Sequence, residues 1–309
     1  MLRSSRSIVS CAYAFLATSA LLLAAGCHRA APPALPANAA TNALRIVSLA
    51  PSLTEIVCAV GGADRLVGRT DVCNHPSNLV AVVPIVGSFG RPHLEPLLAQ
   101  RPTLVLDVDL EDKTMGPTLD RLGIGHRHIP CQHLADIPVA IHVIGRLVER
   151  AEAGDVLARS IDLRVRNRLA AVASVPLEER PLVYVEIWGD PLMTAGRTSF
   201  IAELVRLAGG RNLGDELAND YGTISSEWVL RRNPEVILCL YPGPEHQART
   251  RVAARLGWQT TRAVQSGRVY GDFDLDTILR PGPRVLDGVE QLRRAIAGGG
   301  STNAPPAGN

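Results

Sequence analysis

The chain has 309 residues, of which 46% are hydrophobic, and its 32 basic and 30 acidic side chains give a formal net charge of +2 at pH 7. A chain so close to neutrality offers no strongly basic surface, so we expect no nucleic-acid partner. The length is enough for one large domain or for two lobes with cores of their own.

The first 26 residues have the pattern of a bacterial export signal. Arg3 and Arg6 precede an apolar run over residues 8–23, which is short for a membrane span and typical of a signal-peptide core. The run leads through Leu-Ala-Ala-Gly to Cys27, as in a lipoprotein processing site. We expect Cys27 to be lipidated and to anchor the protein on the periplasmic or extracytoplasmic side of a membrane. An ordinary secretory peptide and an uncleaved anchor are the alternatives.

The rest of the chain alternates short apolar strands with helices, which is typical of an α/β fold with mostly parallel sheets. We expect two Rossmann-like lobes, over residues 44–136 and 175–297, joined by one long bridging helix over residues 137–174. Residues 27–43, rich in Ala and Pro, are expected to form a flexible tether. Residues 298–309 are expected to form a disordered tail.

In the first lobe, apolar runs bounded by polar or glycine-rich loops predict five strands. These strands cover residues 46–50, 66–70, 83–87, 104–108 and 126–130. Helices are expected at residues 53–60 and 94–100. Ser52 and Glu55 have the spacing of a capping box at the start of the first of these helices.

The bridging helix is predicted from apolar residues that recur in steps of three and four, at Ile141, Ile144, Val148, Leu157 and Ile161. At about 1.5 Å per residue, residues 137–174 would run over about 50 Å and cross from one lobe to the other. Two consecutive helices with a break near a glycine, residue 154, are the alternative.

In the second lobe, strands are predicted at residues 182–187, 236–240 and 268–271, and helices at 199–208, 225–232 and 283–297. One pattern occurs in both lobes. Glu95 opens a short helix that stops before Pro102, and Glu227 opens another that stops before Pro234, each followed by a buried strand. The repeat indicates lobes related by pseudo-symmetry.

No catalytic motif was found: the chain has no nucleophile elbow, no zinc-protease helix and no phosphate-binding loop. Asp272, Asp274 and Asp276 alternate as in a calcium loop, but the glycine and the distal glutamate of that loop are missing. We therefore expect no enzymatic activity, no resident metal and no cofactor.

Two Cys-x-His pairs, Cys73 with His75 and Cys131 with His133, follow predicted strands. Three interpretations stay open: a Cys73–Cys131 disulfide, which an extracytoplasmic compartment favours, two free or unrelated thiols, or a ligating role for zinc, copper or cobalt. The last would suit a metal-dependent enzyme. Cys58 and Cys239 lie within apolar runs and are expected in the core.

Aromatic residues are few, and three of them, Phe89, Trp188 and Tyr221, lie beside glycines in loops or at strand ends. Loops at the carboxyl ends of parallel strands form the ligand crevice of open α/β sheets, where flat rings can stack on a large conjugated ligand. The remaining candidate ligand-binding residues are polar: Ser52, Asn74, Arg91, Asp276 and Arg280. Arg197 is a further crevice-side arginine, whereas Trp228 and Trp258 are expected to pack inside the lobe.

The order of these pieces resembles a known family. Residues 45–102 run from a strand and a Pro-Ser-Leu-Thr-Glu segment through Asp71–Pro76 to Val86–Glu95. Residues 188–196, 221–227 and 280–284 continue the likeness in the second lobe. The chain resembles the vitamin B12-binding periplasmic proteins, within the metal-chelate and siderophore-binding proteins of ABC importers.

The resemblance implies a monomer of two lobes that holds its ligand between them and delivers it to an ABC permease with its ATPase. It also implies that Glu95 and Glu227, one on each lobe, dock on the permease. The implied ligand is a cobalt corrinoid, either cobalamin or a precursor. Residues 73–76 have no aromatic where the enteric B12-binding proteins have tyrosine, so a ferric siderophore or haem is the alternative ligand.

Overall fold

The computed structural model describes residues 43–242 and 245–298, which belong to one compact unit. The expected signal peptide, the lipidated Cys27 and nearly all of the expected tether and tail lie outside the described residues. Among the described residues, no helix combines the length and the apolar character needed to cross a membrane.

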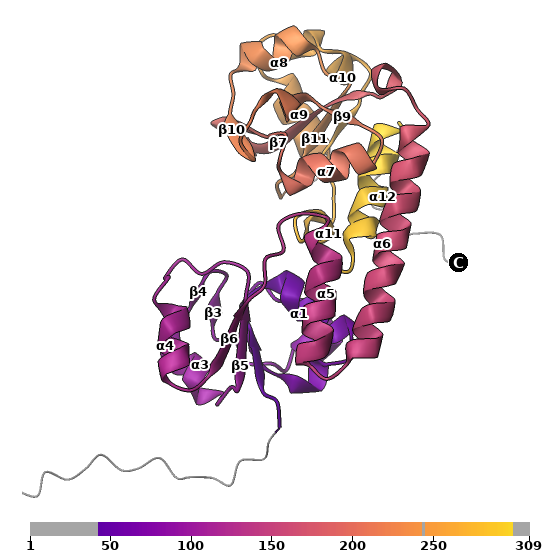
Figure 1. The fold of residues 1–309 in the computed structure, drawn as a ribbon. Coiled ribbons are helices and arrows are strands. Elements are labelled where there is room, and N and C mark those ends of the chain that lie inside the picture. The colour runs from indigo at the N-terminus through magenta and orange to yellow at the C-terminus, as the bar shows by residue number, and fades with distance from the viewer. Residues whose placement is uncertain (1–42, 243–244, 299–309) are drawn as a thin grey trace, which may run out of the picture. The chain divides into compact units, whose positions relative to one another are not determined.

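The first lobe is built on a four-stranded parallel sheet in the order β2-β1-β5-β6 (Figure 1). Its strands are β1 (Ile46–Ser48), β2 (Leu66–Arg69), β5 (Leu104–Asp107) and β6 (Gly125–His128). The helices of this lobe are α1 (Pro51–Ala59), α2 (Ser77–Val80), α3 (Leu94–Ala99), α4 (Met115–Arg121) and a 3₁₀ turn, Ala63–Arg65. β1 and β5 are buried on both faces, which explains why their sequences are mostly apolar.

The predicted strand over residues 83–87 is not a continuous strand. Ile85 forms only an isolated parallel bridge with Arg69, and the chain then enters a short hairpin of β3 (Gly87–Ser88) and β4 (Arg91–Pro92). Gly87 has a φ of +145°, and a Cβ there would lie 2.7 Å from the Arg91 carbonyl oxygen. The glycine therefore permits the tight hairpin that ends the pairing with β2.

The predicted capping box is wrong, because α1 begins one residue before Ser52, at Pro51. Proline suits the first helical position because its missing N–H would have no partner there. Ser52 and Glu55 therefore lie inside the helix, and both are buried. The burial of Glu55 requires a partner for its charge.

The predicted single helix over residues 137–174 is also wrong. The segment forms α5 (Asp136–Leu147) and α6 (Ala151–Ala173), and the chain turns between them at Glu149, whose φ is +59°. The two helices then pack closely, since a Cβ on Gly145 would lie 3.0 Å from the Gly154 Cα. The apolar positions thus belong to two facing helices, and the turn comes before Gly154. Of these two helices, only α6 connects the lobes, and it is about 35 Å long.

The second lobe has a six-stranded sheet in the order β10-β8-β7-β11-β12, with β9 paired to β7. Its strands are β7 (Leu182–Gly189), β8 (Leu192–Ala195), β9 (Arg211–Asn212), β10 (Tyr221–Thr223), β11 (Val236–Cys239) and β12 (Val269–Tyr270). β7, β11 and β12 are parallel, and β8 and β10 form an antiparallel edge. The prediction of mostly parallel sheets in an α/β fold is therefore confirmed.

The helices of the second lobe are α7 (Phe200–Leu207), α8 (Ser226–Arg232), α9 (Glu245–Ala253), α10 (Arg262–Gln265), α11 (Leu275–Ile278) and α12 (Val285–Ile296), with 3₁₀ turns at Leu177–Glu179, Leu213–Glu216 and Trp258–Thr260. Of these, α7, α8 and α12 begin within two residues of their predicted starts, whereas α9, α10 and α11 were not predicted. Ser199 and Ser225 cap α7 and α8 by accepting hydrogen bonds from the amides of Ala202 and Trp228.

The repeated glutamate–proline pattern has the same backbone in both lobes. α3 and α8 each carry a glutamate in the first turn, and Arg101 and Asn233 then adopt left-handed φ values of +47° and +48°. A proline follows each of these residues and leads into a central strand. A left-handed residue followed by proline stops a helix abruptly and redirects the chain.

The C-terminal segment forms a second connection between the lobes. After β12 the chain crosses to the first lobe at α11, and α12 returns beside α6 (Figure 1). The carboxylate of Glu55 on α1 accepts hydrogen bonds of 2.9 and 2.7 Å from Arg284 and one of 3.3 Å from Arg280. One hydrophobic cluster extends from β1 and α1 through α5 and α6 to α7 and α12. The lobes thus share a core beside the connecting helix.

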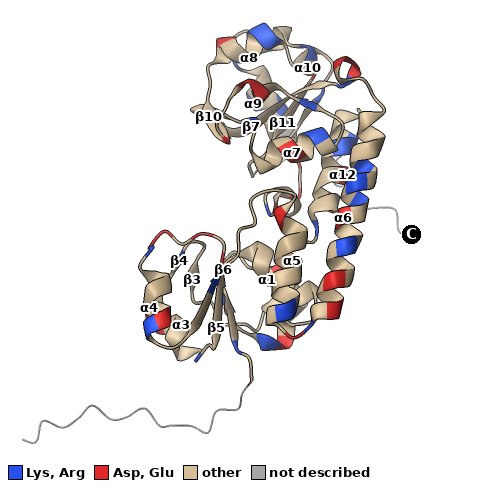
Figure 2. Cartoon of the chain, in the orientation of Figure 1, with Lys and Arg blue, Asp and Glu red and all other residues tan. Residues whose placement is uncertain are grey.

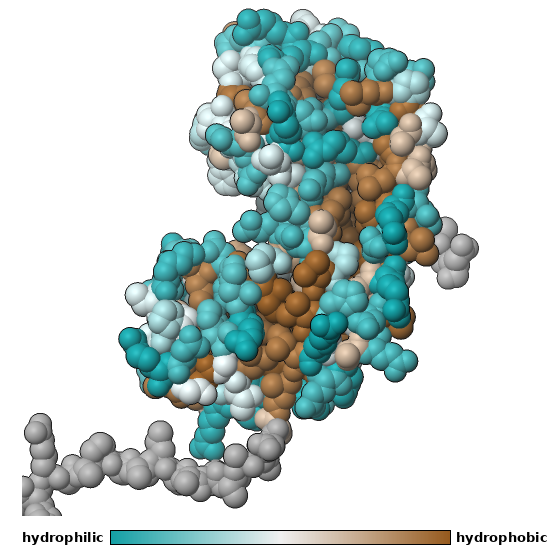
Figure 3. Space-filling model, viewed as in Figure 1, coloured by the Kyte–Doolittle hydropathy of each residue, from teal (hydrophilic) through white to brown (hydrophobic). Residues whose placement is uncertain are grey.

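Charge and apolar surface are distributed unevenly over the connecting helices. In Figure 2, acidic residues gather toward the start of α6 and basic residues toward its end. Figure 3 shows apolar surface over α5 and the upper part of α6. Val139 on α5 and Leu169 on α6 are 60% and 48% exposed. A hollow of about 830 Å³ lies between the start of α5, α6 and α7.

Candidate functional site

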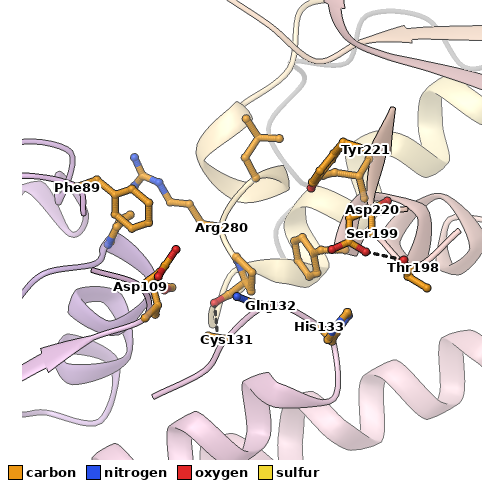
Figure 4. Close-up of a pocket in the computed structure, with 17 residues that line it drawn as sticks. Phe89, Asp109, Cys131, Gln132, His133, Thr198, Ser199, Asp220, Tyr221 and Arg280 are labelled. Atoms are coloured by element: carbon orange, nitrogen blue, oxygen red, sulfur yellow. Dashed lines mark hydrogen bonds between the residues drawn. The ribbon is translucent and has the colours of Figure 1, made fainter. Parts of the chain in front are cut away.

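A pocket of about 360 Å³ lies between the lobes and is lined by both (Figure 4). The first lobe contributes Pro51 and Ser52 after β1, Val108 and Asp109 after β5, and residues 131–133 after β6. The carboxyl ends of parallel strands meet at this edge of the sheet, which is where open α/β sheets bind ligands. The volume is in the range of small-molecule sites.

Two aromatic side chains are exposed on opposite sides of the pocket. Phe89, from the hairpin of the first lobe, is 47% exposed, and Tyr221, at the start of β10 in the second lobe, is 45% exposed. Figure 4 shows them at the two ends of the pocket, with Arg280 between them. Burial raises the pKa of the Tyr221 hydroxyl, so the tyrosine is neutral at physiological pH. Each wall therefore offers an uncharged ring to a ligand.

Arg280 is the cation of the pocket, and a set of polar residues fixes its position. Its guanidinium donates to Asn74 Oδ1 at 2.7 Å and to the Val72 carbonyl at 3.2 Å, and it forms an ion pair of 2.6 Å with Asp276. With Glu55 at 3.3 Å, two carboxylates neutralise this one arginine. The guanidinium is pre-organised, because its rotamer is set by four neighbours before any ligand arrives.

The remaining polar groups of the pocket are held by short contacts. Thr198 donates to Asp220 Oδ1 at 2.5 Å, and Cys131 Sγ donates to the Pro281 carbonyl at 3.0 Å. Burial raises the pKa of the Cys131 thiol to about 12, so it stays protonated at neutral pH.

A sequence profile described as "Periplasmic binding protein" matches residues 46–274, which is most of the described chain. The chain belongs to the periplasmic binding protein family. It is an ABC transporter substrate-binding protein of the class that includes B12-, haem- and siderophore-binding members. The relatives found are transport proteins and not enzymes, and the family is extracytoplasmic.

Three relatives illustrate the similarity. The uncharacterized ABC transporter substrate-binding lipoprotein YvrC of Bacillus subtilis is 28% identical over 257 residues, which cover 82% of this chain and 79% of that protein. The periplasmic vitamin B12-binding protein BtuF of Vibrio cholerae has a TM-score of 0.69 at 25% identity, covering 82% and 97%. A periplasmic heme-binding protein of Pseudomonas aeruginosa has a TM-score of 0.72 at 25% identity, covering 85% and 95%.

The binding protein brings together four of the predicted ligand-binding residues: Ser52, Phe89, Tyr221 and Arg280 line the pocket. Asn74 and Asp276 do not line it; they contact each other at 2.9 Å and both hold Arg280. Their position suggests support of the arginine and not direct contact with a ligand.

Three other predicted residues lie elsewhere. Arg91 pairs with Glu111 at 2.5 Å on the surface, and Arg197 donates to the Asp215 carbonyl at 2.7 Å. Trp188 lines a separate hollow together with Tyr241, and its indole N–H donates to the Asp190 carbonyl at 2.8 Å. Trp188 is part of the strand β7, which ends at Gly189, and does not belong to a loop that lines the pocket.

Of the alternatives left open for Cys73 and Cys131, the structure has two free thiols, with no disulfide between them. Cys73 is held between the hydroxyls of Thr54 and Thr70, at 3.1 Å from each, whereas Cys131 faces Pro281. No group of three or more His, Cys, Asp or Glu side chains that could hold a metal ion occurs in the described residues. The two Cys-x-His pairs thus do not form the metal centre that the enzyme alternative required. Cys58 and Cys239 lie in the core, as predicted.

Several pocket residues were not predicted as ligand-binding: Gln132, His133, Thr198, Asp109 and Asp220. Gln132 and His133 follow β6 by a few residues. They could have been predicted by treating every polar residue just after a parallel strand as a candidate. No sequence pattern indicates that Asp220 lines the pocket, because its position depends on the antiparallel pairing of β10 with β8.

The two predicted docking residues are accessible. Glu95 and Glu227 are exposed in the first turns of α3 and α8. Hydrogen bonds from its own amide and from Ser225 lower the pKa of Glu227, so it stays ionised. Their role stays a prediction.

Proposed function

We propose that this binding protein captures a cobalt corrinoid, cobalamin or a precursor, in the pocket between its lobes and delivers it to an ABC permease. The observation that carries the proposal is the pair of exposed rings, Phe89 and Tyr221, on opposite walls of one pocket. Exposed aromatic rings in a concave site favour a broad ligand with apolar edges or faces. The named ligand of the Vibrio cholerae relative supports the corrinoid among such ligands.

Haem or a ferric siderophore is the second candidate. Arg280 favours it, because a fixed guanidinium can bind the carboxylates of haem or the anionic groups of a siderophore. The heme-binding relative from Pseudomonas aeruginosa also supports it. Against it, Glu55 and Asp276 already neutralise Arg280, which weakens its attraction for an anion.

The proposal extends to the partners. Glu95 and Glu227 would dock the loaded monomer on arginines of the permease, with one carboxylate from each lobe. Lipidation of Cys27 would keep the protein at the membrane that holds the permease, and no resident cofactor is required.

The test is calorimetric titration of the purified protein with cyanocobalamin, cobinamide, hemin and a ferric siderophore. We expect one-to-one binding of a corrinoid, and weakening by about 1 kcal/mol or more in Tyr221→Ala and in Phe89→Ala. Trp188→Ala is the matched control, since this ring is equally exposed but lies outside the pocket. Binding of hemin or the siderophore without either corrinoid would contradict the proposal and select the second candidate.

A further inference from the structure

A second hollow adjoins the segment that lines the ligand pocket. It has a volume of about 830 Å³ and lies between the start of α5, the later half of α6 and α7. We call it the α6 hollow. A concave, mostly apolar space of this size is typical of small-molecule sites. Its larger apolar side chains are Leu134, Pro138, Val165, Leu169 and Val172.

The α6 hollow is elongated along the helix for which it is named. The α6 residues that line it run from Asp162 to Ala173, which is about 17 Å along the helix axis. Val165, Leu169 and Val172 are spaced by four and three residues, so their side chains form one apolar stripe over this length. Leu169 is nearly half exposed, and Figure 3 shows apolar surface over this part of α6. A linear apolar group that lies on the stripe would remove that surface from water.

Three arginines border the α6 hollow, and one of them has no carboxylate partner. Arg166 and Arg206 form ion pairs of 2.7 and 2.9 Å with aspartates. Arg180 instead donates to the carbonyls of Val172 and Val175 at 2.9 Å each. Over residues 43–242 and 245–298, no carboxylate pairs with Arg180 and no acceptor is described for its Nη1. The carbonyls fix this guanidinium beside the end of α6, where its charge can receive an anion.

The α6 hollow and the ligand pocket share a wall. Leu134 lines the α6 hollow, and the residue before it, His133, lines the pocket. Glu203 also borders the α6 hollow, and its carboxylate accepts a hydrogen bond of 2.8 Å from the Leu134 amide. This carboxylate is therefore already engaged, and a molecule in the α6 hollow would contact the segment that shapes one side of the pocket.

We propose that the α6 hollow binds a fatty acid, with the carboxylate on Arg180 and the alkyl chain along the apolar stripe. One carboxylate matches the one arginine that lacks such a partner, and one alkyl chain matches the single stripe. Binding forms an ion pair at Arg180 without breaking another contact, because the guanidinium keeps its bonds to the carbonyls. The inference goes beyond the proposed function and does not depend on it.

The test is calorimetric titration of the purified protein with octanoate, decanoate and laurate, each below the concentration at which it forms micelles. We expect one-to-one binding, with the Kd falling about fourfold for each added methylene. Decanoate should also bind about tenfold more tightly than 1-decanol, because only the acid has a charge for Arg180. No binding of any acid, or binding that does not depend on chain length, would overturn the inference.

Two substitutions locate the site. Arg180→Met keeps an apolar stem and removes the charge, so decanoate and 1-decanol should then bind with equal affinity. Leu169→Gln should weaken both about tenfold, whereas Leu163→Gln should match the wild type, since Leu163 is similarly exposed on the same helix but lies outside the hollow. Unchanged binding in Leu169→Gln, or a preference for decanoate that persists in Arg180→Met, would overturn the inference. The two leucine variants decide the question even if loss of the Arg180 bonds weakens the end of α6.

Discussion

Glu55→Gln is expected to destabilise the protein far more than an ordinary surface substitution. Glu55 is 4% exposed, and its carboxylate contacts two arginines of the C-terminal segment, Arg280 and Arg284. The same carboxylate raises the pKa of Arg284, which keeps that side chain charged. The substitution removes the negative charge, and it also turns an amide NH₂ toward two guanidinium groups.

The magnitude follows from the geometry. Arg284 binds Glu55 through two hydrogen bonds, and the side chains of Arg280 and Arg284 are only 12% and 21% exposed. Removing one partner of a buried ion pair costs about 3–5 kcal/mol, and partial exposure of the arginines favours the lower end. We expect a loss of about 3 kcal/mol. For a folded unit of this size that corresponds to a fall in Tm of about 6–12 °C.

The assay is urea unfolding followed by tryptophan fluorescence, with the m-value as a check that both lobes unfold together. Glu149→Gln is the matched control. Glu149 forms one ion pair of 3.2 Å with Arg65, and its side chain is 71% exposed, so we expect a change of less than about 0.5 kcal/mol. A loss below about 1 kcal/mol in Glu55→Gln would refute the view that this ion pair stabilises the connection between the lobes.

Three further predictions concern docking, titration and packing. Glu95→Arg combined with Glu227→Arg should abolish uptake in cells and leave ligand affinity unchanged, and uptake that survives would contradict the docking assignment. The thiol of Cys131 has its pKa raised by burial from 9.0 to about 12, so the stability it contributes is complete below pH 9 and lost as the pH rises toward 12. The free energy of unfolding should fall over this range, less steeply in Cys131→Ala, and an unchanged slope would count against the burial argument. Gly154→Val should lower the free energy of unfolding by about 1–3 kcal/mol in urea titration, because a Cβ there would lie 3.1 Å from the Gly145 Cα; a neutral result would show that the helices can separate.

The central strands could be predicted because they depend on local patterns. The strands around Ile46 and Val236 are apolar and buried on both faces, so each forms a continuous hydrophobic run. The turn at Glu149 could not be predicted, because the apolar steps of α5 and α6 fit one helix as well as two. Only the contact between the helices, which lies outside local sequence, distinguishes them.

The candidate site was predictable in part for the same reason. Phe89 and Tyr221 were identified from their loops, but no sequence pattern indicates that Glu55 pairs with Arg284, more than two hundred positions away. Buried ion pairs depend on tertiary contacts that leave no periodic signal. Trp188 shows the opposite error: its neighbouring glycine resembled a crevice loop, yet the strand continues past it.

The second connection between the lobes has a mechanical consequence. One helix alone would let two bodies twist and bend about it, but α6 and the segment from α11 to α12 run between the lobes together, and Glu55 fixes the end of the second to α1. Two connections side by side resist twisting of one lobe against the other and permit mainly small shear movements between the lobes. Ligand binding between lobes held in this way depends on the contacts that the ligand makes with the pocket and not on closure of the lobes around it. Because the pocket lies between the lobes, release would require the lobes to be displaced against both connections.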